Sequence, residues 1–283
     1  MEQSHQRPQK LTPSNYYSHD TDWYYMSFSL FKDFQKCEAA ALAKLKDEWE
    51  PTNSMPLLVG NYVHSYFEST KSHTDFLAAH GKDIMTKPTK KEPHGHLRSE
   101  FKVANGMIQT LQNDKMFNYF YTPGKKEVIV TGKIDGYWWK GKIDSLMLNK
   151  NYFCDLKTAD DILGKHWIEV NGRSQKTNFI MARKYNLQMA IYKELIKQSF
   201  HRACAPLIFA VSKQDPPDKM GIDFDDDDDR FYMQEQMEIL RETQERYWKI
   251  MNGEIKPEPC YRCEYCRTHM QLSHFVHASE IEV

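Results

Sequence analysis

The fold expected of this 283-residue chain follows from one stretch, KIDSLMLNKNYFCDLKT, at residues 142–158. It contains two short β-prone runs separated by asparagines, which predicts a hairpin. Side chains alternate between faces along a strand, so Asp155 and Lys157 point the same way, and Asp144 on the preceding strand can lie opposite them. Two carboxylates placed like this suit Mg²⁺ or Mn²⁺, and a neighbouring ammonium can orient or deprotonate a metal-bound water.

The surrounding sequence predicts an α/β fold. Further β-prone runs at 127–132 and 134–139 extend the hairpin into a small antiparallel meander. Helical spacing and a strand-like apolar run predict the remaining elements: a helix capped by Ser27 and running through Leu45, helices over 57–70, 100–113 and 182–198, a strand over 206–211, and a helix after the acidic run 225–229. This order predicts a central mixed β-sheet flanked by helices.

One domain over residues 27–270 is expected, between a flexible N-terminal lead-in at 1–26 and a polar tail at 271–283. A hydrophobic content of 40% and an aromatic content of 13% exclude collagen-like, mucin-like and wholly disordered chains. The sequence shows no apolar run of bilayer length, and the start MEQSHQRPQK lacks a signal core, so a cytoplasmic protein without a membrane partner is expected. The net charge of -1 means that any DNA binding must come from local patches.

The Asp-x-Lys triplet alone is weak evidence, because an Asp near a turn is usually a turn residue and an edge-strand Lys usually limits aggregation. Asp135 in Gly-Lys-Ile-Asp duplicates the pattern around Asp144. We favour Asp144 because its distance in sequence from Asp155 suits a short hairpin.

Four motifs occur in order along the chain: Gly60-Asn-Tyr-Val-His64, Gly141-Lys-Ile-Asp144, Asp155-Leu-Lys157-Thr and Gln188-Met-Ala-Ile-Tyr192. Over residues 24–270 the chain resembles the RecB-like branch of the PD-(D/E)xK nuclease superfamily, and within it the phage and prophage exonuclease VIII (RecE)-like nuclease domains. The resemblance implies a restriction-endonuclease-like core around a central mixed sheet.

The resemblance also implies roles for these residues. His64, Asp144, Asp155 and the backbone carbonyl of Leu156 would bind the metal, and Lys157 would be the catalytic lysine. Gln188 and Tyr192 would position the lysine, the DNA or both.

Structural alternatives stay open for three residues near these motifs. His64 can be a buried structural histidine, and Tyr192 can be a core aromatic residue. Glu68, one turn after His64, can support the imidazole or be a solvated helix charge. Gly60 lies one turn before His64, so its missing side chain leaves room on that face of the helix.

The cysteines form a second candidate site. Cys260, Cys263 and Cys266 supply three thiolates at a repeated two-residue gap, and a tetrahedral site needs a fourth, for which Cys37 is the candidate. The related nucleases imply a [4Fe–4S] cluster; Zn²⁺ and an empty thiol group are the alternatives. Cys154 and Cys204 are expected to be core residues.

DNA contacts are expected mainly from the segment 164–184, which we interpret as a loop between the catalytic strand and the Gln188 helix. Its candidates are Lys165, Trp167, Arg173, Lys176, Arg183 and Lys184.

The resemblance implies a Mg²⁺- or Mn²⁺-dependent DNA exonuclease, acting 5′ to 3′ on duplex DNA in phage-type recombination. A single-strand annealing recombinase would be its partner, a homo-oligomer is possible, and the gene would belong to a phage or prophage in a bacterial host. The alternatives are a non-catalytic DNA-binding or interaction module on the same fold and a CRISPR-adaptation or defence nuclease.

Overall fold

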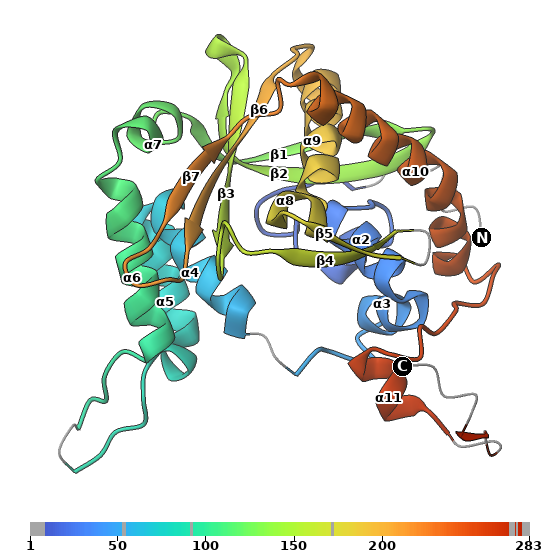
Figure 1. Cartoon of the computed structure of the whole chain (residues 1–283), viewed down its shortest axis with the longest axis horizontal. Coiled ribbons are helices and arrows are strands. Elements are labelled where there is room, and N and C mark those ends of the chain that lie inside the picture. The colour runs from blue at the N-terminus through green and yellow to red at the C-terminus, as the bar shows by residue number, and fades with distance from the viewer. Residues whose placement is uncertain are drawn as a thin grey trace.

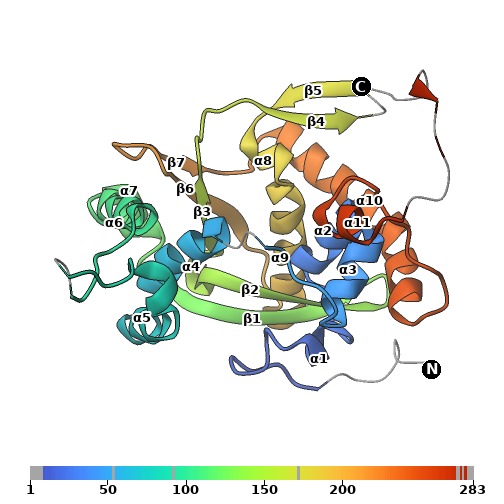
Figure 2. The same cartoon turned by 90° about the horizontal axis from the view of Figure 1, so that it is seen from below.

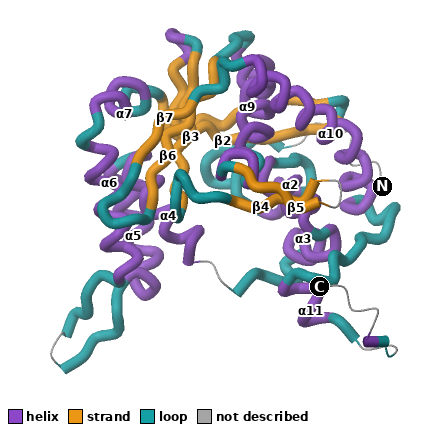
Figure 3. Tube along the Cα trace, in the orientation of Figure 1, coloured by secondary structure: helices purple, strands orange, loops and turns teal. Residues whose placement is uncertain are grey.

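The structure is a computed structural model that describes residues 9–52, 55–90, 93–170, 173–271, 275, 277 and 278 (Figure 1). A five-stranded sheet in the order β1-β2-β3-β6-β7 forms its centre, and helices cover both faces (Figure 3). The strands are β1 Lys125–Ile134, β2 Tyr137–Met147, β3 Tyr152–Ala159, β6 Ala205–Ser212 and β7 Lys219–Ile222. The β3–β6 pair is parallel and the other pairs are antiparallel, which confirms the predicted mixed α/β sheet.

The first hairpin is longer than the sequence suggested. The run at 127–132 extends into β1, and the runs at 134–139 and from Lys142 merge into β2. Ile134 pairs with Tyr137 across a two-residue turn. The turn residues Asp135 and Gly136 both have positive φ, 47° and 88°, as a type I′ turn requires. Asp135 therefore belongs to a turn at the far end of the hairpin.

Strands β3 and β6 are buried on both faces because they lie between two apolar cores. Along β6, Ile208 and Ala210 join one core and Phe209 and Val211 join the other. This explains the continuous apolar run, which is typical of a strand covered on both sides.

Helices α9 Tyr185–Phe200, α2 Phe28–Lys36 and α10 Asp227–Met251 contribute to the first core. Helices α4 Met55–Glu68, α6 Ser99–Gln112 and α7 Lys115–Phe120 contribute to the second. In Figure 1 these two groups lie on opposite sides of the central strands. The predicted helices over 57–70, 100–113 and 182–198 correspond to α4, α6 and α9.

The helix predicted from Ser27 is two helices. The Ser27 hydroxyl caps α2 by accepting from the amide of Leu30 at 3.2 Å, as predicted. At Cys37 the backbone becomes extended (φ −167°), and α3 Glu38–Leu45 follows in a new direction. Helical spacing cannot reveal such a break, because the apolar residues of the two helices remain in phase across Cys37.

The segment predicted as a loop at 164–184 contains a hairpin and a short helix. Strands β4 His166–Val170 and β5 Arg173–Thr177 form their own two-stranded sheet, followed by α8 Phe179–Ala182. Figure 2 shows this hairpin on the opposite side of the molecule from α1 His19–Asp22. The sequence did not indicate α5 Thr70–Ile84 either.

Residues 9–26, here called the N-terminal strap, pack against the sheet instead of forming a flexible lead-in. Met26 exchanges backbone hydrogen bonds with Trp138 and Lys140 at 2.8 Å, and its side chain is buried. The ammonium of Lys140, which is 2% exposed, binds the Tyr16 carbonyl, the Thr21 hydroxyl and the Asp22 carboxylate, each at 2.7 Å. This tertiary ion pair has no local sequence signal, so polar composition alone suggested mobility.

The remaining described elements are the 3₁₀ turn η1 Leu148–Lys150 and α11 Glu264–His269. The acidic run begins α10, where Asp226 caps the helix by accepting from the amide of Asp228. Most of the predicted tail at 271–283 and residues 1–8 of the lead-in lie outside the described residues. Among the described helices, none combines the length and apolar character that a membrane span requires.

Candidate active site

The candidate site forms where β2 and β3 separate. Their ladder ends at the pair Ser145–Cys154, and the next residues along the strands are Asp144 and Asp155. With no strand partner there, the amide of Leu156 donates to Asp144 Oδ2 at 2.7 Å. The separation therefore opens the sheet at the two predicted carboxylates and lets Asp144 reach across the gap.

Asp155 and Lys157 point to the same face of β3, as the strand period predicts, and form an ion pair with Nζ and Oδ2 2.6 Å apart. Burial raises the pKa of Asp155 to about 6, with a further contribution from Asp144 and opposition from Lys157. Burial disfavours the charge on Lys157, but Asp155, Tyr185 and Asp144 raise its pKa above the ordinary value. The Lys157 ammonium also lies 4.6 Å from the centre of the Tyr185 ring.

His64 reaches the site from α4, and its Nδ1 lies 3.4 Å from Asp144 Oδ2. Burial lowers the pKa of His64, Lys157 lowers it further, and Asp155 raises it. A neutral imidazole beside two carboxylates is a donor set that binds a divalent cation. Glu68 lines the same cavity but accepts a hydrogen bond from Ser72 at 2.6 Å.

Gln188 and Tyr192 face the site from α9, one helical turn apart. Gln188 Nε2 donates to the Tyr192 hydroxyl at 3.0 Å, and both side chains are buried. Gln188 Oε1 is buried and has no hydrogen-bond partner among the described residues, so it can accept one from a bound group. Gly141 admits the Tyr192 ring, because a Cβ there would lie 2.8 Å from Tyr192 Cε1.

Glu127 is a further acidic residue of the site that sequence reasoning missed. The β1–β2 register places it opposite Asp144, between the pairs Lys126–Ser145 and Val128–Ile143. Its φ of 52° is rare for a non-glycine residue, and such strain gathers at functional sites. Burial and Asp144 raise the pKa of Glu127, and its carboxylate contacts Lys142. The Asp-Gly turn was the available signal, since counting back from it pairs residue 127 with residue 144.

These side chains line one cavity of about 670 Å³. The N-terminal strap supplies part of its wall through Tyr16, Tyr17, His19 and Asp22. The Lys142 ammonium lies 4.4 Å from the centre of the Tyr17 ring, which ties the strap to the β1–β2 hairpin.

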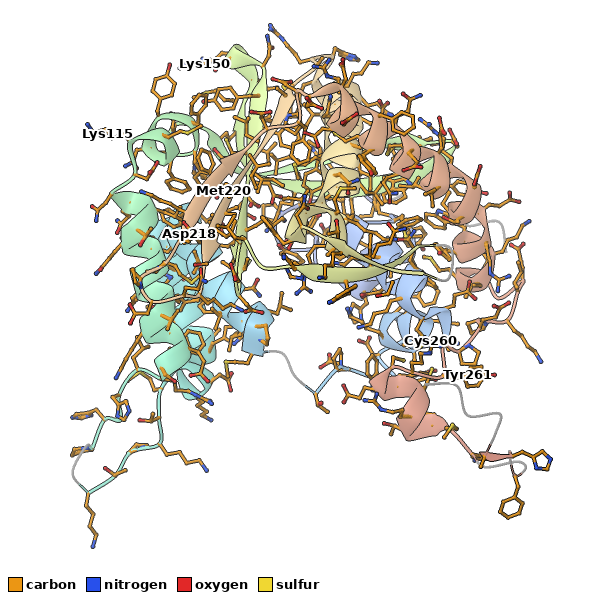
Figure 4. All side chains as sticks on the ribbon, viewed as in Figure 1. Lys115, Lys150, Asp218, Met220, Cys260 and Tyr261 are labelled. Carbon is orange, nitrogen blue, oxygen red and sulfur yellow. The ribbon has the colours of Figure 1, made fainter. Side chains whose placement is uncertain are left out.

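The four cysteines predicted to act together do come together. All four sulfurs lie within 4.8 Å of one another, with Cys37 and Cys266 3.5 Å apart and Cys260 and Cys266 3.9 Å apart. Figure 4 shows Cys260 and Tyr261 beside α11, at the edge of the molecule. Burial disfavours ionisation of Cys260, but backbone amides of Arg262 and Cys263 lower its pKa to about 6.

This cluster joins the N-terminal end of α3 to the C-terminal segment of the domain. Cys154 and Cys204 are buried elsewhere in the apolar cores, as predicted.

The predicted DNA contacts divide into four candidates at or beside the β4–β5 hairpin, Arg183 at a cavity, and Lys184. Trp167 is 61% exposed on β4, and the Lys176 ammonium lies 5.1 Å from its ring centre. Lys165 is exposed just before β4, and Arg173 begins β5. Arg183 lines a second cavity beside the first one.

Of the predicted DNA contacts, Arg183 alone is among the described residues that line either cavity. Lys184 differs from the hairpin candidates because it donates to Gln35 Oε1 at 2.8 Å. Its left-handed backbone at the start of α9 turns the side chain toward α2. The structure therefore does not bring Lys184 to the site.

Comparison with known proteins identifies two informative similarities. The model of the family described as "PDDEXK-like domain of unknown function (DUF3799)" matches residues 27–269. The crystal structure of a "Putative exonuclease" from Eubacterium rectale is 32% identical in sequence, with a TM-score of 0.83 over 95% of this chain and 97% of the other. The structure of SSO0001, 14% identical over 84% of this chain and 91% of the other, has a TM-score of 0.31 and supports no conclusion. None of the curated proteins matches.

Proposed function

Because the chain belongs to the family of PDDEXK-like domains, as its ordered motifs predicted, we propose that it is a metal-dependent deoxyribonuclease acting at DNA ends. The observation that carries the proposal is the meeting of Asp144, Asp155, Lys157 and His64 at one cavity. The similarity to the exonuclease-named structure from Eubacterium rectale supports the choice of an exonuclease.

The donor set fits a hard divalent cation. Asp144 and Asp155 are carboxylates in a low-dielectric site with raised pKa values, and a cation would offset the cost of ionising both. His64 and the Leu156 carbonyl would complete the protein ligands. Bound Mg²⁺ or Mn²⁺ would supply Lewis-acid stabilisation of the phosphate and a more acidic water.

The protein's own residues then have separate tasks. Lys157, held by Asp155 and the Tyr185 ring, would orient the water and stabilise negative charge on the phosphate. Gln188 and Tyr192 would act as positioning residues, since their hydrogen bond holds two polar tips beside the lysine.

The test is cleavage of end-labelled linear duplex DNA with and without Mg²⁺ or Mn²⁺. Asp144→Asn and Lys157→Ala should each lower the rate by about 100-fold or more while the circular dichroism spectrum is unchanged. Asp135→Asn is the matched control, because Asp135 has the same Gly-Lys-Ile-Asp context but lies in the distal turn. Full activity in both site variants would refute the assignment of these residues. No cleavage by the wild-type protein with either metal would favour a non-catalytic DNA-binding module.

We extend the proposal to 5′-to-3′ resection of duplex DNA in phage-type recombination, on the resemblance of the four motifs to exonuclease VIII-like domains. Such resection leaves a 3′ single strand, which a single-strand annealing protein would bind. Labelling the 5′ or the 3′ end separately tests the direction: early release of the 5′ label, with the 3′ label retained, is expected. The reverse order would overturn the direction without affecting the metal chemistry. Light scattering of the purified protein tests the proposed homo-oligomer.

For the four cysteines we propose a single tetrahedral ion, Zn²⁺, instead of a four-iron cluster. With Zn–S bonds of about 2.3 Å, the sulfurs of a tetrahedron lie about 3.8 Å apart. The sulfur distances of 3.5 and 3.9 Å agree with this edge. In a four-iron cluster each thiolate binds a different iron, so the four sulfurs must spread further apart.

Metal analysis of anaerobically purified protein tests this assignment. One zinc per chain and no absorption near 400 nm are expected, with loss of the zinc in Cys37→Ser. Cys204→Ser is the matched control, because Cys204 is buried away from the cluster. A brown protein with about four irons would overturn the assignment.

A further inference from the structure

A second cavity, of about 340 Å³, lies against the catalytic cavity. The two cavities share four lining residues: Leu57, Asn61, His64 and Lys157. His64, a proposed metal ligand, and Lys157, the proposed catalytic lysine, therefore lie at the boundary between the two cavities. A strand whose phosphate is cleaved at this boundary would extend into both.

The second cavity has the charge that a phosphate needs. Lys157, His166, Arg183 and Lys213 line it, whereas Asp160 is the one acidic residue among its described lining residues. Lys213 is paired with Asp160 at 2.9 Å. Arg183 makes no ion pair with any described residue, so its guanidinium is available to an anion.

The larger cavity has a different balance of charge. Among the described residues, six acidic side chains line it, Asp22, Asp33, Glu68, Glu127, Asp144 and Asp155, against the four lysines Lys44, Lys140, Lys142 and Lys157. A phosphate is repelled from those acids unless a cation is bound. The basic cavity accepts a phosphate without that requirement. The two sides of the boundary are therefore suited to different parts of the substrate.

The second cavity also has an aromatic wall. Phe179 and Tyr185 both line it, with ring centres 6.2 Å apart in an edge-to-face arrangement. Phe179 is buried, so the half-buried Tyr185 ring is the accessible part of this wall. The face of an aromatic side chain binds any base by stacking, without selecting its sequence. Asn61 adds an exposed amide at the boundary.

We propose that this second cavity binds the terminal nucleotide of the cleaved strand, with its phosphate at Arg183 and its base against the aromatic wall. The role in cleavage rests on the proposed nuclease function, but nucleotide binding itself does not. A cavity of this size beside the reacting groups limits the product to a short unit, so the enzyme should release mononucleotides.

Gly60 offers a way to block this cavity selectively. It lines only the second cavity, and a Cβ added there would meet Thr158 Oγ1 at 3.5 Å, an ordinary contact. The room left by this glycine thus opens toward β3 and the second cavity. Gly60→Leu should fill part of the space from a helix that tolerates the larger residue.

The test is calorimetric titration of the full chain with thymidine 5′-monophosphate at low salt in EDTA. The wild-type protein should bind it, and Arg183→Ala and Gly60→Leu should each weaken binding at least tenfold. Arg230→Ala and Gly81→Leu are matched controls that should bind as the wild type does. Arg230 and Gly81 line neither cavity, and a Cβ at Gly81 would meet nothing within 4 Å.

Three results would overturn the proposal. The wild-type protein does not bind the nucleotide, both cavity variants bind it as tightly as the wild type does, or inorganic phosphate binds as tightly as the nucleotide. A DNA-cleavage assay on the same proteins separates the two hypotheses. If DNA is not cut but nucleotide binding depends on Arg183 and Gly60, the nuclease proposal fails and the nucleotide site stands. If DNA is cut to mononucleotides by both variants at the wild-type rate, the nucleotide site fails and the nuclease proposal stands.

Discussion

Replacing Lys140 with methionine should detach the N-terminal strap while the rest of the fold persists. The Lys140 side chain is 2% exposed, and its ammonium binds three groups of the strap. The backbone hydrogen bonds between the strap and the sheet are made by Met26. Methionine keeps the aliphatic length but leaves the Asp22 carboxylate and the Tyr16 carbonyl without their donor.

The size of the effect follows from burial. Removing one partner of a buried ion pair costs about 3–5 kcal/mol, and the low end applies because the Asp22 side chain is 21% exposed. About 3 kcal/mol corresponds to a roughly hundredfold larger population of the open strap. Because the strap lines the catalytic cavity, the rate of DNA cleavage should also fall.

Hydrogen exchange followed by mass spectrometry measures this directly. Peptides from residues 9–26 should exchange about a hundred times faster in Lys140→Met, while peptides from β3 and β6 stay protected. Lys133→Met is the matched control, since Lys133 is exposed on the same hairpin and should change stability by less than about 0.5 kcal/mol. Unchanged exchange in the strap, or faster exchange spread evenly over the chain, would refute the reasoning.

Three further predictions concern the site and the β4–β5 hairpin. Gly141→Ala should displace the Tyr192 ring, cost about 1–3 kcal/mol in urea unfolding and lower the cleavage rate, whereas Gly81→Ala should be neutral or stabilising; equal stability of the two variants would contradict the close contact. The raised pKa of Asp155, about 6, means that the folded metal-free protein binds a proton more tightly than the unfolded chain does, so its stability should fall as the pH rises from about 4 to 6; Asp155→Asn should flatten this slope, and an unchanged slope would argue against the burial of that carboxylate. Trp167→Ala should weaken binding of single-stranded DNA by about 1–3 kcal/mol in fluorescence anisotropy without changing Mn²⁺ binding, and unaltered affinity would exclude stacking on the hairpin.

Much of the candidate site could be predicted because several of its residues are close in sequence. The shared face of Asp155 and Lys157 follows from the two-residue period of a strand, and Gln188 and Tyr192 meet because they lie one helical turn apart. Glu127 was predictable in principle from the register that the Asp-Gly turn imposes. Glu127 was missed because the predicted β-prone run at 134–139 spans the turn at Asp135 and Gly136, which hid the register.

Other features have no local signal, because they depend on elements distant in the chain. The bend at Cys37 brings its thiol to Cys266, 229 residues away, and no helical pattern marks that bend. The strap is fixed by an ion pair between Asp22 and Lys140, which composition cannot reveal.

The amino-acid order by itself thus determined which chemical groups are available and which face of each element carries them, because backbone periodicity is local. Tertiary packing alone decided where β2 and β3 part, and hence that two carboxylates face an open space instead of continuing a ladder. It also decided that His64 and Lys157 border a basic, aromatic cavity, since that cavity is enclosed by residues from α4, β3, α8 and the segments around them. Cavities arise where separate elements fail to meet, and this depends on the packing of the whole chain.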